Sequence, residues 1–201
     1  LERLLQVLDI RNVSVDALVD WIDSNDQTVS ARGAEDGHYL VASPSYRAAN
    51  QPFTNVSELR LIDGMTEEDY RKLRPHVTAL PVSGLGINVN LATAPVLQSL
   101  DERVTQAQAE AILARVEEER FEDIKNFLAL DEFAGMGLKS DGLGLTTRFF
   151  DVAARITYDD REVNLVSTLY RGPDGRMQVV RRDSGQKNRI TKEPFTVPDG
   201  G

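Results

Sequence analysis

Five carboxylates lie close together in the sequence, with one base, Arg32, among them: Asp20, Asp23, Asp26, Glu35 and Asp36. Calcium is bound in proteins by six to eight oxygen atoms, at about 2.3–2.6 Å, from carboxylates, carbonyls and water. Without a cation, these negative charges would repel one another, and an ordered loop would be costly. This stretch is therefore either a solvated acidic loop or a calcium site, and its composition leaves both interpretations open.

The calcium interpretation predicts a specific set of ligands. Asp23 is expected to end a helix, and Asp26 follows in the loop with Asn25 beside it. Glu35 and Asp36 would fold back across the loop to complete the oxygen shell. The predicted metal ligands are Asp23, Asp26, Glu35 and Asp36, in a loop that is not an EF-hand because threonine stands at residue 28, where that motif has glycine.

The histidines and glycine motifs of the sequence do not form a catalytic pattern. The two histidines, His38 and His76, lie in no Ser/His/Asp or metal-ligand spacing. The absence of cysteine excludes disulfides, thiolate metal sites and cysteine nucleophiles. The glycines at 135–144 form neither a Walker nor a dinucleotide fingerprint. We therefore predict that the chain is not an enzyme.

Short amphipathic helices are predicted over most of the first 130 residues, from apolar residues at helical spacing. Ser14, Thr66, Thr93 and Thr105 are the predicted N-caps. The acidic loop would follow the second helix, and a short strand is predicted at 38–41. The predicted helices are 1–9, 15–22, 56–62, 67–73, 94–100, 106–119 and 121–130.

Alternating hydrophobicity replaces the helical period near residue 149. Segments 149–158, 163–170 and 177–181 each alternate, and a Gly-Pro-Asp-Gly turn at 172–175 joins the last two. This pattern predicts an antiparallel meander, and helices followed by strands predict an α+β protein. The chain from residue 185 on is polar, with two prolines, and is expected to be loose.

Overall composition is that of a globular protein, with 41% hydrophobic and 27% charged residues over 201 positions. No run in the given sequence approaches the roughly 20 apolar residues that span a bilayer, and its first residues do not follow the pattern of a signal peptide. Because the chain opens inside a helical pattern without methionine, we expect that a preceding segment was removed. The net charge of −9 opposes binding to nucleic acid and to anionic membranes.

A DNA-binding module is the alternative interpretation, because residues 87–94 resemble the opening of helix-hairpin-helix domains. Those domains hold phosphates through backbone amides of a glycine-rich hairpin. Here the corresponding turn, 99–104, has no glycine and two acidic residues. The helical block 49–146 carries 16 acidic and 9 basic residues, which opposes counterion-driven binding.

Several short blocks, taken in order, resemble the K-type minor pseudopilins of bacterial type II secretion systems. The resemblance runs from about Ser14 to Ala94, and more thinly through the final strands. The blocks are DWID at 20–23, GAEDxxY at 33–39, YRxANQP at 46–52, SELRL at 57–61, GM at 64–65, ALP at 79–81 and INVNxATA at 87–94.

The resemblance implies a fold plan. A pilin-like domain, in which a helix packs on a small antiparallel sheet, would be formed by residues 1–48 and 147–201. A large all-helical insertion with helix-hairpin-helix-like character would occupy 49–146. An apolar N-terminal helix, absent here, would anchor the protein in the bacterial inner membrane and leave the soluble domain in the periplasm.

The same resemblance implies a structural role in protein export. The protein would form the pseudopilus tip with the I-type and J-type minor pseudopilins and would help to start pseudopilus assembly, with secreted substrates as a further class of partner. Proteins of this type bind calcium in the acidic region, so the resemblance favours Ca²⁺ as the cofactor of the loop. It implies neither catalysis nor binding to nucleic acid.

Overall fold

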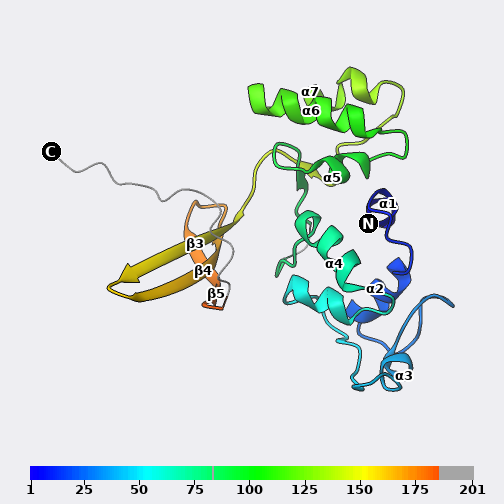
Figure 1. Cartoon of the computed structure of the whole chain (residues 1–201). Helices are drawn as coiled ribbons and strands as arrows, with labels where there is room; N and C mark the ends of the chain where they lie inside the picture. Colours follow the sequence, from blue (N-terminus) through cyan, green and yellow to red (C-terminus); the bar gives the residue numbers. More distant parts are fainter. Residues whose placement is uncertain (83, 186–201) are drawn as a thin grey trace. The chain divides into compact units, whose positions relative to one another are not determined.

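The computed structural model describes residues 1–82 and 84–185 and divides the chain into two compact units, 1–145 and 146–201. The first unit is helical and the second contains an antiparallel sheet (Figure 1), so the α+β expectation is confirmed. The tail that was expected to be loose lies, beyond residue 185, outside the described residues. Over the described ranges, no helix combines the length and the apolar composition that crossing a membrane requires.

The first unit contains short helices and one minimal strand pair. Its elements are α1 (Glu2–Val7), α2 (Val15–Ile22), α3 (Asp36–Tyr39), the 3-10 helix η1 (Val56–Leu61), α4 (Glu67–Leu73), η2 (Arg74–His76), β1 (Ile87–Asn88), α5 (Ala94–Gln98), α6 (Gln106–Glu118), α7 (Ile124–Leu128), η3 (Asp131–Phe133) and β2 (Leu143–Gly144).

Most of the predicted caps define where these helices begin. The side chains of Ser14, Thr66 and Thr105 each accept a hydrogen bond from a backbone N–H in the first turn of their helix. Such bonds satisfy amides that the helix itself leaves unpaired. Thr93 also precedes a helix, but its hydroxyl oxygen lies 2.7 Å from Nδ1 of His76 and makes no bond to its own helix.

The first hydrophobic core joins α1–α4 and the loops between them (Figure 1). It extends across residue 48, where the sequence predicts a domain boundary. The grouping of residues 1–48 with 147–201 stays a prediction. The buried members of this core are Leu4, Leu5, Ile10, Val13, Ala17, Leu18, Trp21, Ala34, Tyr39, Ala48, Leu59, Ile62, Tyr70 and Leu73.

The second core gathers α5, α6, α7 and η3. The parallel pair β1–β2 brings residues 87–88 beside 143–144, so the two ends of this helical group meet. Sequence reasoning missed both strands because two residues are too few to show an alternation. The buried members of this core are Val89, Leu97, Val104, Ala109, Ile112, Phe127, Leu130 and Phe133.

The strand predicted at 38–41 is wrong, because this segment belongs to a turn of helix. Glu35 is the N-cap residue of α3, and its carbonyl accepts hydrogen bonds from the backbone N–H groups of His38 (2.8 Å) and Tyr39 (3.3 Å). Tyr39 is buried, whereas Val41 is 84% exposed. The apolar run therefore reflects one core contact followed by an exposed turn.

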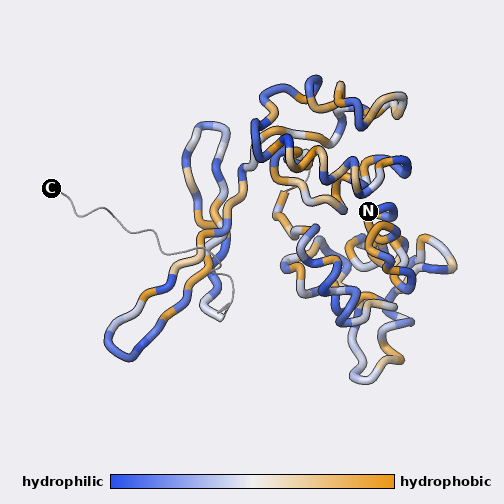
Figure 2. Tube along the Cα trace, turned by 45° about the horizontal axis from the view of Figure 1, so that its top comes forward, coloured by the Kyte–Doolittle hydropathy of each residue, from blue (hydrophilic) through white to orange (hydrophobic). Residues whose placement is uncertain are grey.

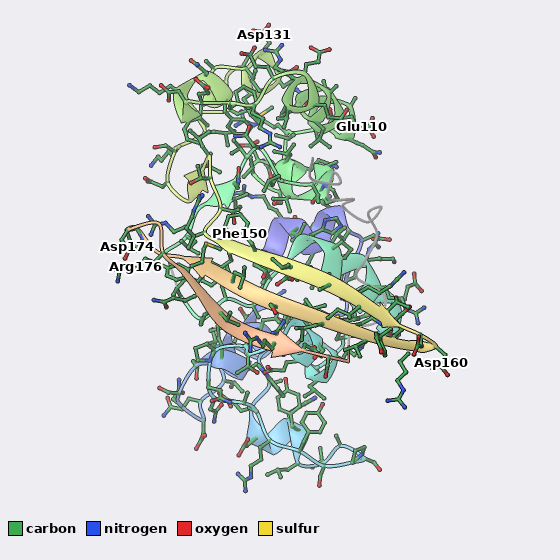
Figure 3. All side chains as sticks on the ribbon, turned by 90° about the vertical axis from the view of Figure 1, so that its left-hand side faces the viewer. Glu110, Asp131, Phe150, Asp160, Asp174 and Arg176 are labelled. Atoms are coloured by element: carbon green, nitrogen blue, oxygen red, sulfur yellow. The ribbon has the colours of Figure 1, made fainter. Side chains whose placement is uncertain are left out.

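The second unit contains the predicted meander. Strands β3 (Phe149–Tyr158), β4 (Arg161–Arg171) and β5 (Met177–Asp183) pair antiparallel in that order. Figure 3 shows Asp160 at the β3–β4 end of the sheet, and Asp174 and Arg176 at the opposite end, where β4 turns into β5. The alternation that predicted the strands is visible along the β3–β4 hairpin in Figure 2, which has a hydrophilic tip.

One face of this sheet is apolar. Cross-strand partners share a face, and Phe150 pairs with Leu169 while Ile156 pairs with Val163. Large apolar side chains on this face are nevertheless about half exposed. They are Val152 (47%), Ile156 (57%), Val163 (55%), Met177 (50%) and Val179 (49%).

Candidate functional site

Asp20, Asp23 and Glu35 bring three carboxylates together in the first unit. One oxygen of each lies within 4.8 Å of the others. Asp20 and Asp23 are three residues apart at the C-terminal end of α2, so they lie on one side of that helix. Glu35 is the residue immediately before α3. Because a helix C-terminus carries partial negative charge, the end of α2 adds to the field that favours a cation here.

Asp20 is the most deeply placed of the three. Its side chain is 0% exposed, and Oδ1 accepts a hydrogen bond of 2.9 Å from the backbone N–H of Val29. Oδ2 is buried and has no hydrogen-bond partner. A buried carboxylate oxygen is costly unless it meets a donor or a cation. Asp20 therefore holds the loop with one oxygen and leaves the other available.

Glu35 presents a second set of unsatisfied atoms. It is 5% exposed, and neither Oε1 nor Oε2 has a hydrogen-bond partner. Burial, followed by the negative charges of Asp20 and Asp23, raises the pKa of the Glu35 carboxyl above its ordinary value. A divalent cation would offset this repulsion, and oxygen-rich carboxylate surroundings suit calcium. The residues present thus fit a hard cation.

Asp23 forms the solvent side of the cluster and is only partly buried. Its Oδ1 accepts hydrogen bonds from both the backbone N–H (3.0 Å) and the side-chain Nδ2 (2.8 Å) of Asn25. These bonds fix the carboxylate at the point where α2 ends. A cation entering from solvent would meet Asp23 first and then the buried oxygens of Asp20 and Glu35.

Two of the predicted ligands do not join the cluster. Oδ1 of Asp26 accepts a hydrogen bond of 3.3 Å from Nδ2 of Asn50. Oδ1 of Asp36 accepts one of 3.0 Å from the backbone N–H of Ala48, and its Oδ2 pairs with Arg47. Both carboxylates still raise the pKa of Glu35 through their charge.

Asp20 is the member of the cluster that the predicted ligand set omitted. Its spacing of three residues from Asp23 on a predicted helix was the available signal. What the sequence could not give was the approach of the loop to this helix. That approach depends on Gly33, because a Cβ built there would lie 2.0 Å from Oδ2 of Asp20.

The histidines make structural contacts. Nε2 of His38 lies 2.9 Å from Oδ1 of Asp63 in an exposed pair. Nδ1 of His76 meets the Thr93 hydroxyl at the start of α5, and burial lowers the pKa of His76. In the described part of the chain, no carboxylate bonds to His76 to complete a catalytic triad.

The turn between α5 and α6 uses its basic side chain internally. Arg103 donates hydrogen bonds to Asp101 and to the carbonyl oxygens of Gly135 (3.1 Å) and Met136 (2.9 Å). The guanidinium holds the pKa of Asp101 at about 2. This turn offers phosphate no free positive charge from Arg103, so it gives no support to a DNA-binding hairpin.

Two family models, both described as type II secretion system (T2SS), protein K, match residues 1–82 and 87–146. A type II secretion system protein K from Pseudomonas aeruginosa is 40% identical over 188 residues, covering 92% of this chain and 56% of the relative. One from Dickeya chrysanthemi is 32% identical over 176 residues, covering 85% of this chain and 48% of the relative. The chain thus spans about half the length of these relatives.

A solved structure is similar over nearly the whole chain. It is a chain of the GspK-GspI-GspJ complex from the type 2 secretion system of enterotoxigenic Escherichia coli. The TM-score is 0.75 at 25% sequence identity, and the match covers 92% of this chain and 69% of that one.

Proposed function

Because the chain belongs to the type II secretion system protein K family, we propose that it is part of a minor pseudopilin that works by assembly and not by catalysis. The observation that carries this proposal is the similarity, over 92% of the chain, to a structure solved as a GspK-GspI-GspJ complex.

The partners would be the I-type and J-type minor pseudopilins, with which this protein would form the pseudopilus tip and start its assembly. The protein would be held in the inner membrane by a helix outside the present sequence, with the body described here in the periplasm. Secreted proteins passing the tip would be a further class of partner.

The apolar face of the β3–β5 sheet supports a pilin-like body. Ile156 and Val163 are paired on this face and stay more than half exposed, although burying such a side chain is worth roughly 1.5–3 kcal/mol. A helix packed on this face would bury them, as the pilin-like plan requires. The helical unit would then be the insertion, and the core that crosses residue 48 favours counting all of 1–145 in it.

The acidic loop would hold Ca²⁺ through Asp20, Asp23 and Glu35. The support for this proposal is the set of buried carboxylate oxygens without hydrogen-bond partners on Asp20 and Glu35. Asp26 and Asp36 would add negative charge from the surroundings, and carbonyl or water oxygens would complete the six to eight ligands that calcium takes.

A mixing experiment tests the assembly role. The chain is combined with the soluble domains of the I-type and J-type proteins from the same bacterium. Size-exclusion chromatography should give one three-component peak. Three folded proteins that elute separately would contradict the proposal, and a salt-dependent shift with duplex DNA would favour the alternative function instead.

Terbium luminescence tests the metal site, because Tb³⁺ replaces Ca²⁺ and the only tryptophan, Trp21, adjoins Asp20. Excitation of Trp21 should sensitise Tb³⁺ emission, and added Ca²⁺ should quench it. Asp23→Ala combined with Glu35→Ala should abolish both the emission and the stabilisation by calcium.

The matched control for the metal test is Glu117→Ala with Glu118→Ala, which removes two exposed carboxylates from α6. This control should keep the emission and the calcium-dependent melt. A wild-type melting temperature that does not change on adding chelator would show that the metal proposal is wrong.

A further inference from the structure

We propose that the cation at Asp20, Asp23 and Glu35 docks α3 onto α2, so that segment 36–50 becomes ordered only with metal while the second core stays folded without it. This inference rests on the metal site of the proposed function and extends it to regulation. The segment would fold where divalent cation is plentiful and loosen where it is scarce.

The loop between the ligands is held by hydrogen bonds, among them Val29 to Asp20 and Asn50 to Asp26, and by little apolar burial. Asp23 ends α2 and Glu35 is the N-cap residue of α3, and residues 24–29 between them are all exposed. The apolar residue that returns to the core is Ala34, next to Glu35. Closing such a loop costs entropy that these exposed residues do not offset by burial.

Where α3 meets α2, an aromatic contact favours docking and two buried carboxylates oppose it. Trp21 follows Asp20, and Tyr39 lies one helical turn after Glu35; their rings meet edge to face at 5.2 Å. An aromatic pair of this kind contributes about 0.5–1.5 kcal/mol beyond its buried area. Uncompensated buried charges cost several kcal/mol each. Without a cation, the cost of burying the Asp20 and Glu35 carboxylates side by side therefore opposes the docking that Trp21 and Tyr39 favour.

Docking of α3 carries the following segment with it. Asp36, in the first turn of α3, accepts the backbone N–H of Ala48 and pairs with Arg47. The backbone N–H of Tyr46 donates to the carbonyl of Tyr39 at 3.3 Å, and their rings stack at 5.2 Å. Since these contacts all end on α3, release of α3 would remove them and loosen the segment, which would keep the bond from the Tyr46 hydroxyl to the carbonyl of Leu61.

The second core has its own set of contacts. Phe127 packs against Phe121 and Phe133, and Ile112 of α6 is fully buried in the same cluster. None of the members of this cluster belongs to the acidic loop or to α3. The second core should therefore stay folded whether or not the cation is bound.

Hydrogen–deuterium exchange of the whole chain, with Ca²⁺ or with chelator, tests the inference. Peptides from 36–50 should exchange at least tenfold faster in chelator, while peptides from α6 (106–118) should keep their protection. An equal loss in both regions, or no loss in 36–50, would overturn the inference.

A variant separates charge repulsion from simple damage to the site. Glu35→Gln keeps the shape of the side chain but removes one buried charge. It should lose Tb³⁺ emission and yet protect 36–50 in chelator better than the wild type does. Asp141→Asn, at an exposed carboxylate in the loop before β2, should behave as the wild type in both measurements.

The outcomes distinguish the proposals from one another. Tb³⁺ emission with cation-independent exchange in 36–50 would refute the docking role and leave the metal site standing. Absence of emission from the wild type would refute the metal site and this inference together. Failure to bind the I-type and J-type proteins, measured separately, would bear only on the assembly role. If Glu35→Gln is no better protected than the wild type in chelator, repulsion is not the cause.

Discussion

Gly33 and Asp20 approach each other so closely that residue 33 has no room for a side chain. A Cβ built on Gly33 would lie 2.0 Å from Oδ2 of Asp20 and 3.1 Å from its Cγ. Oδ2 is also one of the buried oxygens without a hydrogen-bond partner. Glycine at this position therefore keeps open the space in which a cation would meet Asp20.

Gly33→Ala should weaken binding of Ca²⁺ at the proposed site at least tenfold, because the new methyl group displaces the Asp20 carboxylate. Forced overpacking of this kind costs roughly 1–3 kcal/mol, so the melting temperature should fall as well. A Tb³⁺ titration and a thermal melt measure the two effects.

Gly37→Ala is the matched control for that substitution, because a Cβ at Gly37 meets nothing within 4 Å. In the helical conformation of α3, alanine is favoured over glycine by up to about 1 kcal/mol. The control should melt at the same temperature or higher and bind Tb³⁺ normally. If both alanine variants lose binding alike, the close approach of Gly33 to Asp20 does not matter for the metal.

Phe127→Ala should destabilise the helical unit by about 3–5 kcal/mol, because Phe127 is 0% exposed and the truncation leaves a cavity in the second core. Leu91→Ala removes a side chain that is 60% exposed and should change stability by less than about 0.5 kcal/mol. Urea denaturation followed by circular dichroism gives both values. Similar losses for the two variants would contradict the assigned core.

Ile156→Lys should leave the stability of the present chain nearly unchanged, because this side chain is already 57% exposed. In a chain that also carries the helix proposed to cover the apolar face, it should lower the melting temperature and impair assembly with the proposed I-type and J-type partners. Thr157→Lys places the same charge on the opposite face of β3 and should have little effect in either protein. Equal effects of the two lysines would argue against a covered face.

Burial raises the pKa of Tyr39 to about 12, against about 10 for an unfolded tyrosine. Because the unfolded state releases this proton first, the contribution of Tyr39 to stability is complete below pH 10 and declines as the pH rises from 10 toward 12. Absorbance of tyrosinate near 295 nm should show one tyrosine titrating last, and Tyr39→Phe should remove that phase. A variant that retains the late phase would assign it to another tyrosine.

The sequence pattern predicted the helices and strands well where the periodic segment is long and, for a helix, where a capping residue stands at its start. Thr105 was expected to cap a helix over 106–119, and the structure confirms the cap at the start of α6. The β3–β5 meander followed from alternation and a Gly-Pro-Asp-Gly turn. The strand at 38–41 was wrong because a four-residue apolar run has no period that separates a strand from a helical turn.

The sequence by itself determined that acidic residues crowd one loop, that helices precede an antiparallel sheet, and that the ordered blocks match the K family. Tertiary structure decided which carboxylates meet. Asp20 joins Asp23 and Glu35, whereas Asp36 turns toward Arg47 and Ala48. The physical reason is that spacing along a chain fixes only near neighbours, while the distance across a loop depends on packing elsewhere, here Trp21 against Tyr39 and the bare backbone at Gly33.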